Sequence, residues 1–158
     1  MAKHIKYDKT ARTFLILTKN TAYTMGLIND KYLVHYFYGT KHNKNFNLIY
    51  QYRSFSPYPE ETGTSYSPDT APSELPFFGS GDFRIDALRI RNRNGDRCTL
   101  FTYKKHKIFS GRKNIENSFG KLPFAVPDEK TETLCITMED SVSECTLDLY
   151  YTVFFDCD

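Results

Sequence analysis

The sequence predicts an all-β protein, a sandwich of roughly eight or more mostly antiparallel strands with long irregular loops. Aromatic residues make up 16% of its 158 residues, as 12 Tyr and 13 Phe, and such side chains favour strands over helices. Several segments alternate between two faces with the two-residue period of a strand. No segment carries a helical 3.6-residue apolar stripe over about ten or more residues.

Two strand pairs follow directly from this alternation. Residues 22–28 and 31–38 flank Asn29-Asp30, which predicts a tight hairpin, and Tyr23, Met25 and Leu27 share one face of the first strand. Residues 132–139 and 145–155 flank a short polar connection at 140–144. Leu134, Ile136 and Met138 then share one face of their strand, and such a face packs on a core.

A third hairpin is expected over residues 83–92 and 97–103. The connection contains Asn94-Gly95, and both positions of this dipeptide tolerate the positive φ angles of a tight hairpin turn. Arg89, Arg91 and Arg93 would line one face of the first strand, and Lys104, Lys105, His106 and Lys107 would follow across the hairpin. We expect these cations to form a water-facing strand surface.

Two segments are too long for passive connections. Residues 54–81 hold five of the seven prolines together with several aromatic residues. We expect an ordered, irregular excursion that is pinned by its aromatic side chains; the alternative is a linker between two subdomains. Residues 110–127 are similar in composition. Excursions of this kind frequently carry function.

Composition excludes several classes of protein. A net charge of +2 argues against a nucleic-acid partner, which usually requires a strongly basic face. No apolar stretch approaches the length of a membrane span, and the N-terminal residues lack the apolar core of a secretory signal, so we expect a cytoplasmic protein without a membrane partner. The four cysteines are expected as free thiols: Cys98, Cys135, Cys145 and Cys157.

No residue of the chain is proposed as catalytic. The acidic residues lie mainly in turns and on polar strand faces, where we expect them to be solvated: Asp30, Asp86, Asp96, Asp128 and Asp140. The histidines and cysteines lack the spacing of a metal site, and the phosphate-binding glycine loop of nucleotide enzymes is absent. We therefore expect no metal and no cofactor.

Over nearly its whole length the chain resembles the N-terminal domain of bacterial α-galactosidases (melibiases) of glycoside hydrolase family 36. The resemblance is carried by short blocks in a fixed order. They are Thr18-Lys-Asn-Thr-Ala-Tyr, His35-Tyr-Phe-Tyr-Gly-Thr-Lys, Phe55-Ser-Pro-Tyr-Pro, Tyr66-Ser-Pro-Asp-Thr-Ala-Pro-Ser-Glu-Leu-Pro, Phe78-Gly-Ser-Gly-Asp-Phe-Arg, His106-Lys-Ile-Phe-Ser-Gly-Arg, Leu122-Pro, Glu132-Thr-Leu and Leu149-Tyr-Tyr-Thr-Val-Phe.

The resemblance implies a β-supersandwich that precedes a catalytic (β/α)₈ barrel. In the family, a retaining mechanism uses two barrel aspartates about 5–5.5 Å apart. The nucleophile motif of the family begins Lys-Trp-Asp, and this chain has no Trp. The resemblance thus implies that residues 1–158 form a single N-terminal domain that lacks the barrel and its catalytic pair.

Loops of this domain reach the sugar pocket of a neighbouring subunit in some relatives. They do so through an acidic residue and a basic residue, and the positions that correspond here are Tyr52 and Thr64. The resemblance therefore implies that Tyr52, Arg53, Thr64 and Tyr66 are candidate substrate-binding residues at the rim of the pocket.

The function expected from the resemblance is structural. The chain would support the barrel of an α-galactosidase that hydrolyses terminal α-galactosides, help the parent form a homo-oligomer and shape the pocket entrance. The alternative is a free-standing carbohydrate-binding module for galactosides, which predicts aromatic side chains exposed on one flat face. An independent small enzyme is a third possibility.

Overall fold

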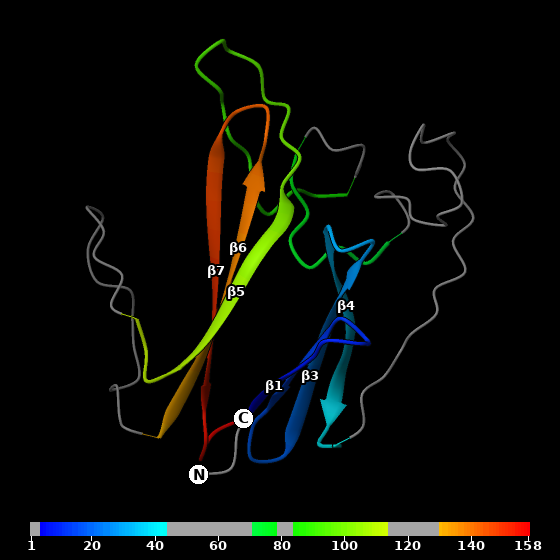
Figure 1. The fold of residues 1–158 in the computed structure, drawn as a ribbon, viewed down its shortest axis with the longest axis vertical. Helices are drawn as coiled ribbons and strands as arrows, with labels where there is room; N and C mark the ends of the chain where they lie inside the picture. Colours follow the sequence, from blue (N-terminus) through cyan, green and yellow to red (C-terminus); the bar gives the residue numbers. More distant parts are fainter. Residues whose placement is uncertain (1–3, 44–70, 79–83, 114–129) are drawn as a thin grey trace.

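The computed structural model describes residues 4–43, 71–78, 84–113 and 130–158, which form seven strands in two antiparallel sheets (Figure 1). The strands are β1 (Ile5–Asp8), β2 (Thr13–Leu17), β3 (Thr21–Ile28), β4 (Tyr32–Thr40), β5 (Thr102–Ser110), β6 (Thr131–Asp140) and β7 (Cys145–Phe154). One sheet has the order β1-β2-β3-β4 and the other the order β5-β6-β7. The described residues contain no helix, and hence none that could cross a membrane. The predicted all-β class is confirmed.

The hairpin between β3 and β4 is the one that the sequence predicts. Asn29 and Asp30 both take positive φ angles, of 54° and 59°, as a two-residue hairpin turn requires. A bulge places Tyr36 between the register pairs Met25–His35 and Thr24–Phe37, and the Tyr36 ring lies over Gly26. A Cβ atom at position 26 would stand only 2.3 Å from that ring, so this close approach depends on glycine.

The second sheet confirms the alternation predicted for 132–139 and 145–155. Leu134, Ile136 and Met138 of β6 are all buried, and Leu147, Leu149 and Tyr151 of β7 pack on the same side. The turn between the strands is not simply solvated, because the Asp140 side chain is only 3% exposed. Its carboxylate accepts hydrogen bonds from the backbone N–H groups of Val142 (3.0 Å) and Leu100 (3.3 Å). The expectation of a solvated Asp140 is therefore wrong.

One core lies between the two sheets. Its buried members from both layers include Phe14, Met25, Leu27, Leu33, Leu134, Ile136, Met138 and Val153. Phe77 and Phe101, from the irregular segments, complete this core with ring centroids 5.6 Å apart in an edge-to-face arrangement. Burial of Phe77 agrees with the predicted pinning of the proline-rich excursion, whose residues 54–70 and 79–81 lie outside the described residues.

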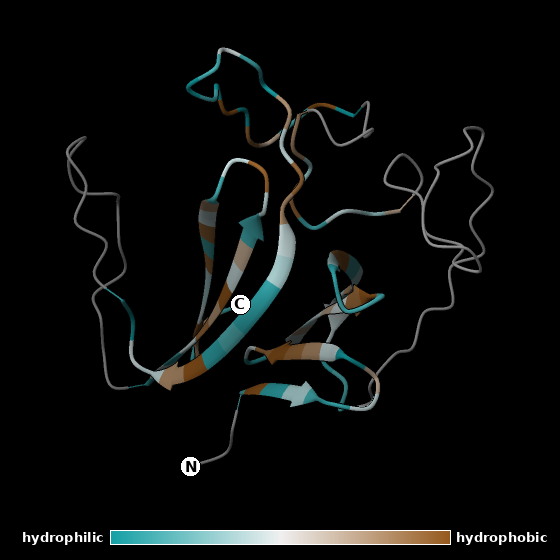
Figure 2. Ribbon diagram, turned by 45° about the horizontal axis from the view of Figure 1, so that its top comes forward, coloured by the Kyte–Doolittle hydropathy of each residue, from teal (hydrophilic) through white to brown (hydrophobic). Residues whose placement is uncertain are grey.

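The third predicted hairpin is wrong as a strand pair. Its turn is present, since Gly95 takes a φ of 92° and its N–H donates to Asn92 O at 2.9 Å. Residues 84–101 nevertheless form only an isolated bridge between Leu88 and Phe77. The regular strand begins at Thr102 instead and carries a bulge between Tyr103 and Lys105. Figure 2 shows the hydrophilic middle of β5 in teal.

Candidate functional site

The four rim residues predicted from the resemblance all lie outside the described residues. Tyr52, Arg53, Thr64 and Tyr66 fall within residues 44–70, so their relation to a pocket stays a prediction. The described residues bring together a different set of titratable side chains, which lies between the two sheets.

The centre of this set is Glu74, on the irregular segment formed by residues 71–78. The segment runs along β4, because His35 N donates to Pro72 O (2.8 Å) and Glu74 N donates to Leu33 O (3.1 Å). An isolated bridge also joins Ser73 to Val34. These backbone contacts hold the Glu74 side chain at the interface of the two sheets, where only 9% of it is exposed.

Both carboxylate oxygens of Glu74 accept a tyrosine hydroxyl. Tyr23 of β3 donates to Oε2, and Tyr151 of β7 donates to Oε1 at 3.0 Å. His35 of β4 lies beside them, with Nδ1 4.0 Å from Oε2. The Tyr23 and Tyr151 rings stack with their centroids 6.4 Å apart. One carboxyl group therefore connects β3 of the first sheet, β7 of the second and the irregular segment.

Burial sets the protonation of this cluster. It raises the pKa of Glu74, and the hydrogen bonds from Tyr23 and Tyr151 pull that pKa part of the way back. Burial is also the largest cause that raises the pKa of both tyrosines, and their interactions with Glu74 raise it further. Both hydroxyls thus keep their protons and can act as donors.

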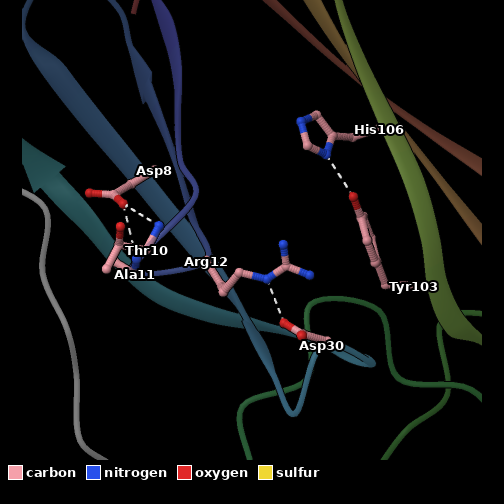
Figure 3. Close-up of polar contacts among 7 residues, drawn as sticks. All are labelled: Asp8, Thr10, Ala11, Arg12, Asp30, Tyr103 and His106. Atoms are coloured by element: carbon pink, nitrogen blue, oxygen red, sulfur yellow. Dashed lines mark hydrogen bonds and ion pairs between the residues drawn. The ribbon is translucent and has the colours of Figure 1, made fainter.

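A second polar cluster joins the sheets near the β3–β4 turn (Figure 3). His106 of β5 points inward with Nδ1 2.7 Å from the Tyr103 hydroxyl, and its ring lies 4.2 Å from that of Tyr7 on β1. Arg12 forms an ion pair with Asp30 close by. Burial, followed by the charge of Arg12, lowers the pKa of His106, so this imidazole is held neutral at physiological pH.

The described neighbours of Glu74 do not include a second carboxyl group, which glycoside hydrolysis needs. That reaction uses two carboxyl groups on either side of the scissile bond. The groups that shift the pKa of Glu74 are two tyrosines and one histidine, and none is a second carboxyl. Within the described ranges no three His, Cys, Asp or Glu residues are placed to hold a metal ion. What the geometry does show is that the hydrogen bonds of Glu74 connect the two sheets.

The arginines predicted to share a strand face have separate environments. Arg89 donates to both carboxylate oxygens of Asp86 (2.9 and 2.7 Å) and lies over the Phe78 ring. Arg91 and Arg93 instead line a depression of about 570 Å³ between residues 90–98 and the β6–β7 turn. The prediction of one continuous cationic strand face is therefore wrong.

Sequence reasoning did not single out the Glu74 cluster. Its four members are far apart in the chain, and no local motif joins them. A signal was nevertheless present, because Tyr23, His35, Glu74 and Tyr151 each belong to a different one of the blocks quoted above. His106 of the second cluster begins a further block.

Comparison with known proteins assigns the chain to the family that its sequence resembles. A profile of the glycosyl hydrolase family 36 N-terminal domain matches residues 31–158. The bifunctional alpha-galactosidase/sucrose kinase AgaSK of Mediterraneibacter gnavus is 32% identical over 98% of this chain and 17% of its own length. The alpha-galactosidase Mel36A of Lactobacillus acidophilus is 33% identical over 96% of the chain and 21% of its own.

Solved structures show the same fold. The galactosidase domain of AgaSK superposes with a TM-score of 0.85 at 31% identity, covering 96% of this chain and 21% of that one. The alpha-galactosidase AgaB of Geobacillus stearothermophilus gives a TM-score of 0.83 at 28% identity and covers 98% and 21%. The chain thus spans about a fifth of the length of these relatives. From its sequence blocks, its two-layer fold and these matches, the chain belongs to the glycosyl hydrolase family 36 N-terminal domain family.

Proposed function

We propose that this chain is a non-catalytic domain of an α-galactosidase that hydrolyses terminal α-galactosides. In this role it packs on the catalytic barrel of the parent, helps the parent form a homo-oligomer and shapes the entrance of the sugar pocket. The observation that carries the proposal is the Glu74 cluster. The buried carboxyl has two hydroxyls and an imidazole as neighbours, and its hydrogen bonds connect the sheets.

The length of the relatives supports the same role. About four-fifths of each alpha-galactosidase chain lies outside the part matched here, and we place the reaction centre there. The rim positions Tyr52, Arg53, Thr64 and Tyr66 remain part of the proposal as contacts at the pocket entrance.

One end of the second sheet offers a surface for further polypeptide. Ile85 and Val142 are 94% and 92% exposed. Ile85 comes from residues 84–101 and Val142 from the β6–β7 turn, and these two parts lie at the same end of the molecule (Figure 1). In the proposed role, these two exposed apolar side chains contribute to a contact with another domain. All four cysteines are free thiols, which agrees with the reducing cytoplasm that we propose as the compartment.

Activity of the purified chain tests the non-catalytic role. We expect no turnover of a nitrophenyl α-galactoside. A rate that survives repurification and disappears in Glu74→Gln would refute the proposal. Calorimetry with melibiose or raffinose should also be silent, whereas measurable binding would favour the carbohydrate-binding module.

A chimera tests the supporting role directly. The matched N-terminal segment of the Lactobacillus acidophilus enzyme is replaced by this chain, and a second variant lacks the segment altogether. We expect the chimera to recover soluble, active enzyme and the deletion variant to lose it. Equal activity in both variants would show that the domain supports nothing in the parent.

A further inference from the structure

The outer face of the second sheet carries a hollow that the function proposed above does not use. The strand register places Lys107, Cys135 and Tyr150 in one row across β5, β6 and β7, and Lys105 lies opposite Thr137 in the next. The short side chain of Cys135 on the middle strand, β6, thus lies between the long side chains of Lys107 on β5 and Tyr150 on β7. The result is a depression of about 380 Å³, here named the lysine groove. This size falls in the range of small-molecule sites, roughly 300–1,000 Å³.

The lysine groove is positively charged. Lys105, Lys107 and Lys113 line it, and none of the described residues that line it is acidic. The carboxylate beside it, Asp148, already accepts hydrogen bonds from the hydroxyls of Thr137 (2.7 Å) and Tyr150 (3.2 Å). No carboxylate of the described residues forms an ion pair with Lys105 or Lys107. The charge of Asp148 acts on Lys113, so an anionic ligand would be attracted mainly by Lys105 and Lys107.

Aromatic rings place the ammonium groups and form two walls. Lys107 Nζ lies 5.9 Å from the centroid of the Phe109 ring, and Lys113 Nζ lies 4.9 Å from that of Tyr150. Lys113 Nζ also donates to the Tyr150 hydroxyl at 2.6 Å. Ammonium groups bind oxyanions as point charges, while ring faces favour the flat, weakly polar side of an organic ring.

We propose that the lysine groove binds a small organic oxyanion, and that a phosphorylated monosaccharide is the class of ligand that fits it. The phosphate lies among the three ammonium groups, and the sugar ring lies between Phe109 and Tyr150. The described residues that line the site belong to β5, β6 and β7, together with Lys113. Binding therefore does not depend on whether the chain supports a catalytic barrel.

Titration of the purified chain with galactose 6-phosphate at low ionic strength tests the proposal by calorimetry. We expect saturable binding that weakens as salt is added, and at least about tenfold weaker binding of galactose or of inorganic phosphate alone. Failure to detect binding would overturn the proposal. Equal affinity for inorganic phosphate would overturn the assignment of a sugar ring, and equal affinity for galactose would overturn the assignment of an anion site.

A matched pair of variants locates the site. The double variant Lys105→Gln/Lys107→Gln should weaken binding by about tenfold or more. Lys104→Gln lies on the same strand, but Lys104 pairs with Glu139 outside the groove, so this control should retain wild-type affinity within about twofold. An equal loss in the control would show a diffuse charge effect and overturn the site.

Cys135 gives a local readout in the otherwise unchanged groove. In a background with Cys98, Cys145 and Cys157 replaced by serine, alkylation of the Cys135 thiol should slow as galactose 6-phosphate fills the groove. Galactose at the same concentration should leave that rate unchanged. Alkylation that is insensitive to the sugar phosphate would place any observed binding elsewhere.

Discussion

Glu74→Ala is expected to lower the free energy of unfolding by about 2–6 kcal/mol. The change removes the acceptor of two tyrosine hydroxyls, those of Tyr23 and Tyr151, at the interface of the sheets. A buried hydroxyl left without a partner costs about 1–3 kcal/mol, and two such groups give the range stated. Glu74→Gln keeps an amide oxygen in the same place, so its loss should stay below about 2 kcal/mol.

Urea denaturation followed by far-UV circular dichroism measures these differences. The sharper test removes a hydroxyl in two backgrounds. In the wild type, Tyr151→Phe deletes a hydrogen bond to a carboxylate and should cost about 1.5–3 kcal/mol. In the Glu74→Ala background the same hydroxyl has lost this acceptor, so removing it should be neutral or stabilising.

Tyr38→Phe is the matched control, because the Tyr38 side chain is 64% exposed and its change should cost less than about 0.5 kcal/mol. An equal loss from Tyr151→Phe in both backgrounds would refute the hydrogen-bond account of the cluster. If Glu74→Ala does not fold, Tyr151→Phe measured against Glu74→Gln provides the same comparison.

Three further outcomes follow from the same contacts. Burial raises the folded-state pKa of Glu74 above its ordinary value of 4.5, so the folded state binds the carboxyl proton more tightly than the unfolded chain does. The free energy of unfolding should therefore fall as the pH rises from 4.5 through the raised pKa. Glu74→Gln should flatten this fall in urea titrations between about pH 4 and pH 8, and an unchanged profile would assign the fall to other groups. Phe101→Ala, at 1% exposure, should cost about 3–5 kcal/mol in the same assay, and a loss below about 1 kcal/mol would contradict its place in the core. Arg12→Ala breaks an ion pair whose Asp30 side is 66% exposed, so it should lower stability by about 1 kcal/mol or less, and a larger loss would require a further role for Arg12.

The strands that the sequence predicts correctly are those whose alternation is regular. β6 alternates regularly from Leu134 to Met138 and β7 along its ten residues, and Asn29-Asp30 marks the β3–β4 turn directly. The strand β2 was not predicted, because all five of its residues, Thr13–Leu17, are buried and show no alternation. The strand β5 was misplaced because the bulge between Tyr103 and Lys105 puts Tyr103 and His106, three residues apart, on the same inner side.

The candidate site was less predictable than the strands. Tyr23, Glu74 and Tyr151 meet only because strand register and the course of residues 71–78 bring them together. Neither property is encoded in a local pattern of residue types. Asp140 was unpredictable for the same reason. A turn aspartate is usually solvated, but this one is buried and accepts hydrogen bonds from the N–H groups of Leu100 and Val142.

The places where the chain resembles its family have a physical explanation. A buried polar group requires its partners in position, so Glu74 and its tyrosines cannot be replaced one at a time without leaving an unsatisfied group. Apolar core positions accept exchanges that conserve volume, and surface positions accept most exchanges. The resemblance to the family accordingly consists of short blocks of sequence. Five of these blocks supply the side chains of the two polar clusters: Tyr23, His35, Glu74, His106 and Tyr151. Five blocks of this chain therefore supply the polar side chains through which its two sheets are joined.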